Sequence, residues 1–273
     1  MQKNILVIGA SSGIGYDLCD TLLKQGHTVY CGARRLDRLE GLRKQGAYVF
    51  QTDVCNEEDL HHIVETMAAQ QSSIDIVYAN AGFAIAGPIE ETPIDKVKQQ
   101  FDTNVYGPAR IARKVLPYMR KQGHGRIIIT TSIASRVSTS MNGWYSASKH
   151  AVNGMAKALA QEVAGFNVQI VIVEPGCVKT ELDAVQLADM KATTSLPVYA
   201  DIVDKSYGFL KRGYESGSNS DSTVKTMLAA GFSNKPKLSY QSTLDSKLMF
   251  WVQKIIGEQR LGQIILKLIM RQN

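Results

Sequence analysis

The stretch that decides the fold is NILVIGASSGIG at residues 4–15. A β-branched apolar run leads straight into glycines at positions 9, 13 and 15, and Ile14, Leu18 and Leu22 then recur every four residues, as in a helix. Gly9 permits a tight turn, and the two later glycines remove side chains where backbone approaches a pyrophosphate and packs on a sheet. Free N–H groups at a helix start favour phosphate. The stretch predicts a nucleotide-binding strand–loop–helix unit, although a plain strand-to-helix turn would look similar.

The same alternation of strand and helix patterns continues to about residue 180. Strands are predicted at 4–9, 27–32, 47–50, 74–79, 126–131 and 168–173, and a helix at roughly 57–70. Most of these strands are nearly continuous apolar runs, which is typical of parallel strands buried on both faces. We therefore expect an α/β fold: a Rossmann-like doubly wound parallel sheet of about seven strands, flanked by helices, in a single domain spanning 1–273.

Composition and charge are those of a globular protein and argue against several other classes. Of the 273 residues 44% are hydrophobic and 21% charged, as in ordinary globular proteins. The net charge is +6, and residues 235–273, with seven basic and two acidic side chains, contribute most of it. The nearly neutral remainder argues against a nucleic-acid surface. The four cysteines form no C-x-x-C pair, and no apolar run is long enough to span a bilayer. A cytoplasmic location follows, with no metal site.

Two regions after residue 180 break the regular pattern. Residues 182–234 are predicted to form a substrate lid, with apolar side chains at Leu182, Val185, Leu187, Met190, Tyr199, Tyr207 and Phe209. Residues 235–273 form a basic amphipathic extension, with Leu244, Leu248, Val252 and Ile255 on one helical face and Leu261, Ile264, Ile265, Leu268 and Ile269 on another. Such a helix covers the domain's own core, forms a subunit contact or lies peripherally on a membrane.

The end of the second strand predicts the cofactor. In NAD-binding folds an acid about 20 residues beyond the glycines holds the ribose, whereas NADP-binding folds use arginine for the 2′-phosphate. Here Ala33 stands at the acidic position and is followed by Arg34 and Arg35. Two guanidinium groups suit a phosphate dianion, so NADP(H) is favoured. NAD(H) stays open because Asp37 could reach a ribose, and the two arginines could also be a solvated charge run.

WYSASKH, residues 144–150, places Tyr145 and Lys149 one helical turn apart. Reduction of a ketone needs a proton delivered to oxygen, and the ordinary pKa of tyrosine is about 10. A nearby ammonium is expected to lower that pKa and make the phenol a general acid–base near neutrality. Ser132 ends the fifth strand and would donate a hydrogen bond to the substrate oxygen. Cys177 belongs to no nucleophile pattern, which disfavours a hydrolase.

These motifs, taken in order, resemble the short-chain dehydrogenase/reductase family. The resemblance covers residues 1 to about 180 and rests on GASSGIG at 9–15, DV at 53–54, ANAG at 79–82, Asn104 in FDTNVYG, Ser132 thirteen residues before Tyr145, YSASK at 145–149 and PGCVKT at 175–180. Two positions depart from the family pattern. Ile8 stands where threonine is usual, and Ala79 where asparagine is usual; both affect hydrogen bonds that hold loops.

The resemblance implies roles for individual residues. Lys149 would also hold the nicotinamide ribose, Asn104 would hold a water that links Lys149 to solvent, and Val178 and Thr180 would meet the nicotinamide carboxamide. The candidate catalytic residues are Asn104, Ser132, Tyr145 and Lys149. The candidate cofactor-binding residues are Gly9, Ser11, Ser12, Gly13, Ile14, Gly15, Arg34, Arg35, Asp53, Val54, Asn80, Ala81, Gly82, Tyr145, Lys149, Pro175, Gly176, Val178 and Thr180.

The predicted function is an NADP(H)-dependent oxidoreductase. The apolar lid predicts an apolar alcohol or ketone, because pockets are lined mainly by hydrophobic side chains, and the whole resembles hydroxysteroid- and retinol-dehydrogenase-like members. The resemblance also implies a homodimer or homotetramer. One alternative is a non-catalytic NADP-binding regulator, which would generally lack the tyrosine or the lysine. The other is a membrane-associated scaffold, which only the C-terminal extension supports.

Overall fold

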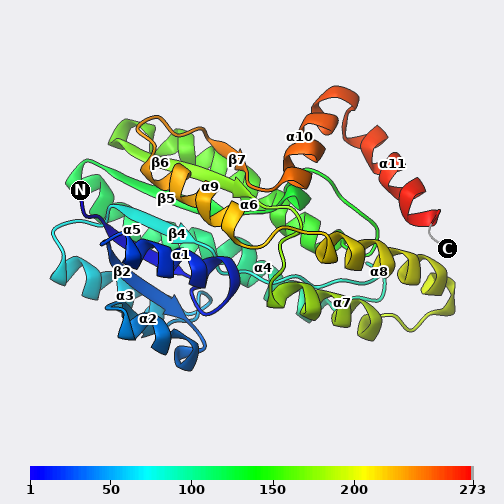
Figure 1. Ribbon diagram of the computed structural model, residues 1–273, viewed down its shortest axis with the longest axis horizontal. Helices are drawn as coiled ribbons and strands as arrows, with labels where there is room; N and C mark the ends of the chain where they lie inside the picture. The colour runs from blue at the N-terminus through cyan, green and yellow to red at the C-terminus, as the bar shows by residue number, and fades with distance from the viewer. Residues whose placement is uncertain (272–273) are drawn as a thin grey trace.

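The centre of the molecule is a parallel sheet with the strand order β3-β2-β1-β4-β5-β6-β7 (Figure 1). The computed structural model describes residues 1–271. The strands are β1 (Asn4–Ile8), β2 (Thr28–Ala33), β3 (Tyr48–Gln51), β4 (Ile76–Ala79), β5 (Gly125–Thr130), β6 (Val168–Glu174) and β7 (Ser239–Gln241), and every pairing is parallel. The predicted Rossmann-like fold is confirmed, and the six strands predicted from apolar runs lie within two residues of their observed ends.

Both faces of the sheet are covered by helices, because successive strand residues point to opposite sides. Leu6 and Ile8 belong to one core cluster and Ile5 and Val7 to the other. The first cluster is closed by α3 (Glu57–Gln70), α5 (Gly107–Gln122) and α6 (Gly143–Glu162), and the second by α1 (Gly13–Lys24), α2 (Glu40–Lys44) and α9 (Asp221–Phe232). Burial of both faces explains why the sequences of the central strands β1, β4 and β6 are largely apolar.

Two elements lie where the sequence predicted something else. Residues 221–232 were assigned to the lid, but α9 packs on the sheet through Val224, Met227 and Ala230. Residues 239–241 were assigned to the extension, but they pair with β6 and form the edge of the sheet. The two corrections have different causes: α9 has apolar residues but follows a polar patch within the irregular segment, whereas β7 is a short polar strand without an apolar signal of its own.

The remaining helices gather beyond the carboxyl ends of the strands. They are α4 (Ile94–Phe101), α7 (Glu181–Thr193), α8 (Ala200–Glu215), α10 (Leu244–Ile256) and α11 (Glu258–Met270). The connections contain the short turns η1 (Leu36–Leu39), η2 (Asp102–Tyr106), η3 (Ile133–Ser135), η4 (Ala164–Phe166) and η5 (Pro197–Tyr199). In Figure 1, α10 and α11 project at the end of the molecule opposite the N-terminus. The strand order reverses between β1 and β4, and ligands of open α/β sheets bind in the crevice at that point.

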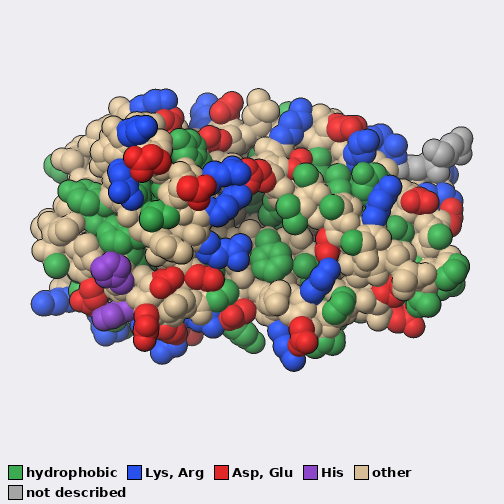
Figure 2. All heavy atoms as spheres, turned by 90° about the horizontal axis from the view of Figure 1, so that it is seen from below, with side chains coloured by type: hydrophobic (Ala, Val, Ile, Leu, Met, Phe, Trp, Pro, Cys, Tyr) green, Lys and Arg blue, Asp and Glu red, His purple; other side chains and the backbone are tan. Residues whose placement is uncertain are grey.

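The surface in Figure 2 carries acidic and basic side chains interspersed, without a broad area of one sign. Within residues 1–271, no helix combines the length and the apolar character that crossing a bilayer requires.

Candidate active site

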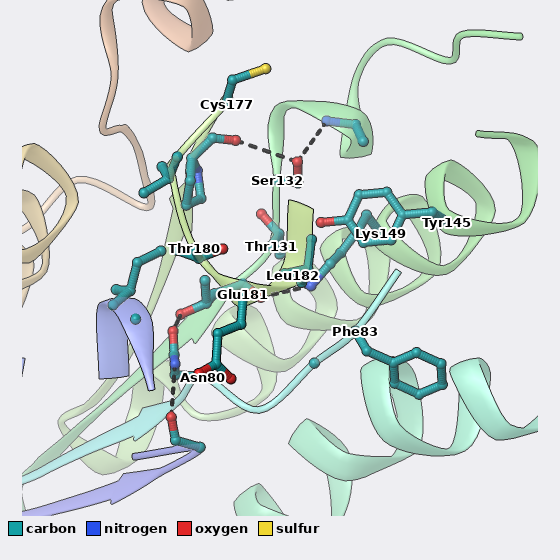
Figure 3. A pocket seen from close by; sticks show the side chains of 18 of the residues that line it. Asn80, Phe83, Thr131, Ser132, Tyr145, Lys149, Cys177, Thr180, Glu181 and Leu182 are labelled. Atoms are coloured by element: carbon teal, nitrogen blue, oxygen red, sulfur yellow. Dashed lines mark hydrogen bonds between the residues drawn. The ribbon is translucent and has the colours of Figure 1, made fainter. Parts of the chain in front are cut away.

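A cleft of about 360 Å³ lies at the carboxyl ends of the strands. Its walls come from the glycine loop after β1, the ends of β2, β4 and β5, the start of α6 and the segment that joins β6 to α7. Figure 3 shows Ser132, Tyr145 and Lys149 together on one side of this cleft, and Thr180, Glu181 and Leu182 on the segment that crosses it. The cleft therefore combines the glycine loop with the proton-transfer residues.

The glycine loop is held in a conformation that side chains would prevent. Gly9 has φ +95°, and a Cβ there would lie 2.5 Å from the backbone nitrogen of Ala81. A Cβ on Gly15 would clash with the carbonyl oxygen of Gly9. Asn80 secures the loop: its side-chain amide donates to the Gly9 carbonyl, and its oxygen accepts from Thr130. The asparagine of ANAG thus connects the loop to β5 despite the unusual Ala79.

The start of α1 is open to an anion. Ser12 is the N-cap of this helix, yet its side chain makes no capping hydrogen bond. The first N–H groups of α1 therefore remain available to a ligand. The predicted cofactor residues Ser11, Gly13 and Ile14 also line the cleft, as do Asp53, Val54, Ala81 and Gly82.

Arg34 and Arg35, which the sequence suggests for a 2′-phosphate, also line the cleft. Arg35 donates to Oγ of Ser12 at 2.9 Å and pairs with Glu181 at 2.8 Å. Arg38 also pairs with Glu181, at 2.7 Å. Arg38 and Glu181 are not predictable from the sequence, because no local pattern indicates a pairing between residues more than 140 positions apart.

The predicted proton-transfer residues meet at the inner end. Tyr145 and Lys149 lie on the first turns of α6, with the ammonium nitrogen 5.6 Å from the centre of the tyrosine ring. Lys149 is only 5% exposed, and it donates to the carbonyl oxygen of Thr130 at 3.3 Å. Ser132 is held at the end of β5 by the N–H of Ala134, which donates to its Oγ, and by its own long hydrogen bond of 3.4 Å to the Pro175 carbonyl.

Burial shifts the pKa values of both groups away from their charged forms. Burial raises the pKa of Tyr145 to about 12, although a hydrogen bond with Ser132 acts in the opposite direction. Burial also lowers the pKa of Lys149 to about 8. The net shift of the Tyr145 pKa is therefore upward in this structure, opposite to the predicted direction, because desolvation of the phenolate is the largest contribution. At neutral pH the tyrosine is protonated and the lysine charged.

Asn104 lies in η2, a π-helical turn between α4 and α5, and such turns often mark functional sites. Its side-chain oxygen accepts from the N–H of Phe83, and its amide group donates to the Phe83 carbonyl and to Oγ of Ser148. Both amide protons are thus used within the protein. Gly82 lies between Asn104 and Lys149, since a Cβ there would be 3.1 Å from one and 3.5 Å from the other. Asn104 fixes the backbone that covers the lysine.

The segment from Pro175 to Thr180 forms the roof of the cleft. Thr180 occupies the N-cap position of α7 without a side-chain capping hydrogen bond, and its side chain lies against Gly13 of the glycine loop. The N–H of Cys177 donates to Asp245, another cleft residue that the sequence did not reveal. Burial, followed by the charge of Asp245, raises the pKa of the Cys177 thiol to about 12. This cysteine therefore stays protonated and is a poor nucleophile.

The apolar half of the cleft is built by the predicted lid and by the C-terminal helices. Its hydrophobic lining consists of Val137, Leu182, Met190, Phe209, Leu210, Met249 and Ile269. Tyr199 and Tyr207 pack beside Met190, whereas Val185 points to solvent. In the extension, Leu261, Ile265 and Ile269 are buried, while Val252, predicted on the same face as Leu244, turns inward.

The donor set fits a nicotinamide dinucleotide. The uncapped N–H groups of α1 suit a pyrophosphate, the arginines suit a further phosphate, and the buried ammonium of Lys149 makes one hydrogen bond within the described chain, leaving donors for a ribose. In residues 1–271, histidine, cysteine and acidic side chains form no cluster of three that could hold a metal ion. Fold and site together define a dinucleotide-binding oxidoreductase.

Comparison with known proteins identifies the family. The model of the short chain dehydrogenase family matches residues 3–191, and this chain belongs to the short-chain dehydrogenase/reductase family. It is 30% identical over 251 residues to a probable short-chain type dehydrogenase/reductase, VdlC, of Helicobacter pylori, covering 92% of each chain. It is 38% identical over 177 residues to 3-ketodihydrosphingosine reductase of Bacteroides thetaiotaomicron, covering 64% of each.

The fold is also found in solved members. A short-chain dehydrogenase from Streptomyces avermitilis superimposes with a TM-score of 0.83 at 28% identity, covering 96% of this chain and 95% of that one. Solved proteins of this fold hold either NAD or NADP. The chain is thus an oxidoreductase that uses a nicotinamide cofactor.

Proposed function

We propose that this protein is an NADP(H)-dependent reductase of neutral, apolar ketones, which also oxidises the corresponding alcohols. The observation that carries the proposal is the order of groups along one cleft. Arg34 and Arg35 lie at one end, Ser132, Tyr145 and Lys149 at the other, and an apolar wall lies beyond them. When bound, the cofactor supplies the hydride for the carbonyl carbon; the residues supply the proton and the orientation.

Tyr145 is the proton donor to the substrate oxygen. With a pKa of about 12, its hydroxyl is protonated across the neutral range and is ready to act as an acid. Acting as a base in the reverse reaction would require additional positive charge beside it. Lys149 holds the ribose and supports the charge change at Tyr145.

Ser132 orients and polarises the substrate oxygen. Its hydroxyl already contacts Tyr145, and its 3.4 Å hydrogen bond to Pro175 is long, so redirecting that proton to a substrate costs little. Two hydroxyl donors would then converge on one oxygen, which stabilises the developing alkoxide. Asn104 acts as a positioning residue that keeps the Gly82–Phe83 backbone in place; the proton relay implied by the family resemblance would have to avoid its occupied amide protons.

The apolar half of the cleft supports a neutral substrate. Among the described cleft residues outside the proposed cofactor-binding groups, two side chains are charged, Glu181 and Asp245, and both are acidic. Glu181 pairs with Arg35 and Arg38, and Asp245 accepts from the Cys177 N–H. The described residues of the apolar half include no cation that could bind a carboxylate or phosphate at the far end of a substrate. The similarity to a 3-ketodihydrosphingosine reductase supports a lipid-like ketone.

The experiment measures oxidation of NADPH and NADH with long-chain ketones that differ only in a neutral or a carboxylate terminus. We expect turnover with the neutral ketone and a preference for NADPH. Tyr145→Phe should abolish turnover while NADPH still binds, and Tyr106→Phe, at an exposed tyrosine, is the matched control. NADH preference or selection of the carboxylate would contradict the proposal. NADPH binding without turnover of any ketone would favour the regulator instead.

We further propose that α10 rests on an anionic lipid surface from which such substrates come. Leu244, Leu248, Trp251 and Ile255 lie on one side of α10, each at least 58% exposed, and Lys247 and Lys254 flank them. The inner side of the same helix contributes Met249 to the cleft. A tryptophan and aliphatic row beside lysines is the pattern of an interfacial helix.

Cosedimentation with vesicles of anionic or neutral lipid tests this surface. The wild type should sediment with anionic vesicles, and Trp251→Ser with Leu248→Ser should not. If the wild type does not bind vesicles and the double variant changes its oligomeric mass, the exposed side of α10 is instead a contact between copies of the chain.

A further inference from the structure

Glu181 bridges the cleft at its outer end. The carboxylate is the first residue of α7, and its two oxygens pair separately with Arg35 at 2.8 Å and Arg38 at 2.7 Å. Arg35 directs its other terminal nitrogen to the hydroxyls of Ser12 and Ser11, at 2.9 and 3.3 Å. One anion thus joins the β2 end, the glycine loop and the lid helix.

The position of this carboxylate matters because the same groups suit a phosphate. A guanidinium fork binds carboxylate and phosphate oxygens with the same bidentate geometry. Arg35, Ser11, Ser12 and Glu181 all line the cleft that fits the dinucleotide. A phosphate approaching Arg35 meets a position that the protein has already filled with an anion of its own.

Displacing Glu181 would affect the substrate half of the cleft. Thr180 lies against Gly13 of the glycine loop, and Leu182 is part of the apolar lining. The first turn of α7 is therefore tied to the cofactor half through Glu181 and contributes to the substrate half one residue later. A change at the ion pair is transmitted to the lid by the covalent chain itself.

We propose that Glu181 is an internal competitor for the 2′-phosphate of NADP(H): it occupies Arg35 and Arg38 until that phosphate displaces it, which releases the first turn of α7. The proposal rests on the NADP(H) preference proposed above. The pairs are suited to such exchange, because all three side chains are between 44% and 49% exposed and ion pairs in this environment are weak. A phosphate dianion with three acceptor oxygens can replace them.

Isothermal titration with adenosine 2′,5′-bisphosphate and 5′-AMP tests the competition without catalysis. Glu181→Gln should bind the bisphosphate about three- to tenfold more tightly than the wild type and 5′-AMP equally well. Asp183→Asn removes the same charge from the same turn, but Asp183 accepts from the Ala184 N–H and, within residues 1–271, forms no ion pair with either arginine. This control should leave both affinities unchanged.

Hydrogen exchange at the amides of α7 tests the release. Release of the first turn should show at the second-turn amides, whose N–H groups bond to the first-turn carbonyls. In the wild type, the bisphosphate should accelerate exchange at these amides, 5′-AMP should not, and Glu181→Gln should exchange rapidly without ligand. If Glu181→Gln and the wild type bind the bisphosphate equally well, and both bind it more tightly than 5′-AMP, the proposed competition is wrong. The proposed NADP(H) preference would then still stand. Equal affinity of the wild type for the two nucleotides would overturn both.

Discussion

Replacing Lys149 by methionine should make the protein more stable and inactive. The ammonium is 5% exposed, and burial lowers its pKa from 10.5 to about 8. Since each unit of pKa difference corresponds to about 1.4 kcal/mol, keeping this lysine charged costs the folded state roughly 3 kcal/mol at pH 7. Methionine has a similar shape and no charge. It loses the hydrogen bond to the Thr130 carbonyl, about 1 kcal/mol, so the expected net gain is about 2 kcal/mol.

The dependence of this gain on pH separates charge from packing. The unfolded lysine holds its proton up to about pH 10.5, whereas the folded one releases it near pH 8. Between these values the unfolded state binds more protons, so the stability of the wild type rises with pH. The advantage of Lys149→Met should therefore shrink by about 2 kcal/mol between pH 7 and pH 9.5.

Urea unfolding of both proteins at the two pH values measures the effect. Lys157→Met, at an exposed lysine two turns further along α6, is the matched control and should change stability little at either pH. A Lys149→Met protein that is less stable than the wild type at pH 7, or whose advantage is independent of pH, would refute the assignment of a buried, destabilising cation.

Three further predictions concern the loop, the acid and the positioning residue. Tyr145→Phe should lower kcat by roughly 10²- to 10⁴-fold in stopped-flow reduction while the Kd for NADPH stays near the wild-type value. Gly15→Ala should weaken NADPH binding and lower the unfolding free energy by roughly 1–3 kcal/mol, because the added methyl meets the Gly9 carbonyl; calorimetry and urea titration would show both, and an unchanged protein would contradict the crowding. Asn104→Ala should destabilise by roughly 1–3 kcal/mol, because it leaves the Phe83 N–H without its acceptor and removes one of the two side-chain donors to the Phe83 carbonyl, and unchanged urea midpoints would count against that role.

The parts of the fold with strong local signals were predictable from the sequence. The central strands have apolar side chains on both faces, so their runs show without any tertiary information. The glycine loop was recognisable because Gly9 and Gly15 occupy positions where a side chain would meet backbone. By contrast, β7 is three residues long, polar and partly exposed, and only its pairing with β6 makes it a strand.

The site residues divide in the same way. Tyr145, Lys149 and Ser132 follow a recognisable spacing, and the structure brings them together. Glu181 and Asp245 reach the cleft by tertiary contacts that leave no local pattern. The direction of the Tyr145 pKa shift was mispredicted because spacing reveals the neighbouring charge but not the burial of both groups.

Burial of this pair links the stability cost to the catalytic role. The interior disfavours both the phenolate and the ammonium, so the protein holds a protonated tyrosine beside a cation that has few partners. When a carbonyl is reduced, negative charge develops on the substrate oxygen, where hydroxyl donors and a nearby cation act through a medium of low dielectric constant and are worth more than in water. The desolvation that destabilises Lys149 in the folded state is thus the condition that strengthens its effect on the reaction. For this reason, Lys149→Met should raise stability and lower activity. If Lys149 only stabilised the helix, its replacement would lower both stability and activity.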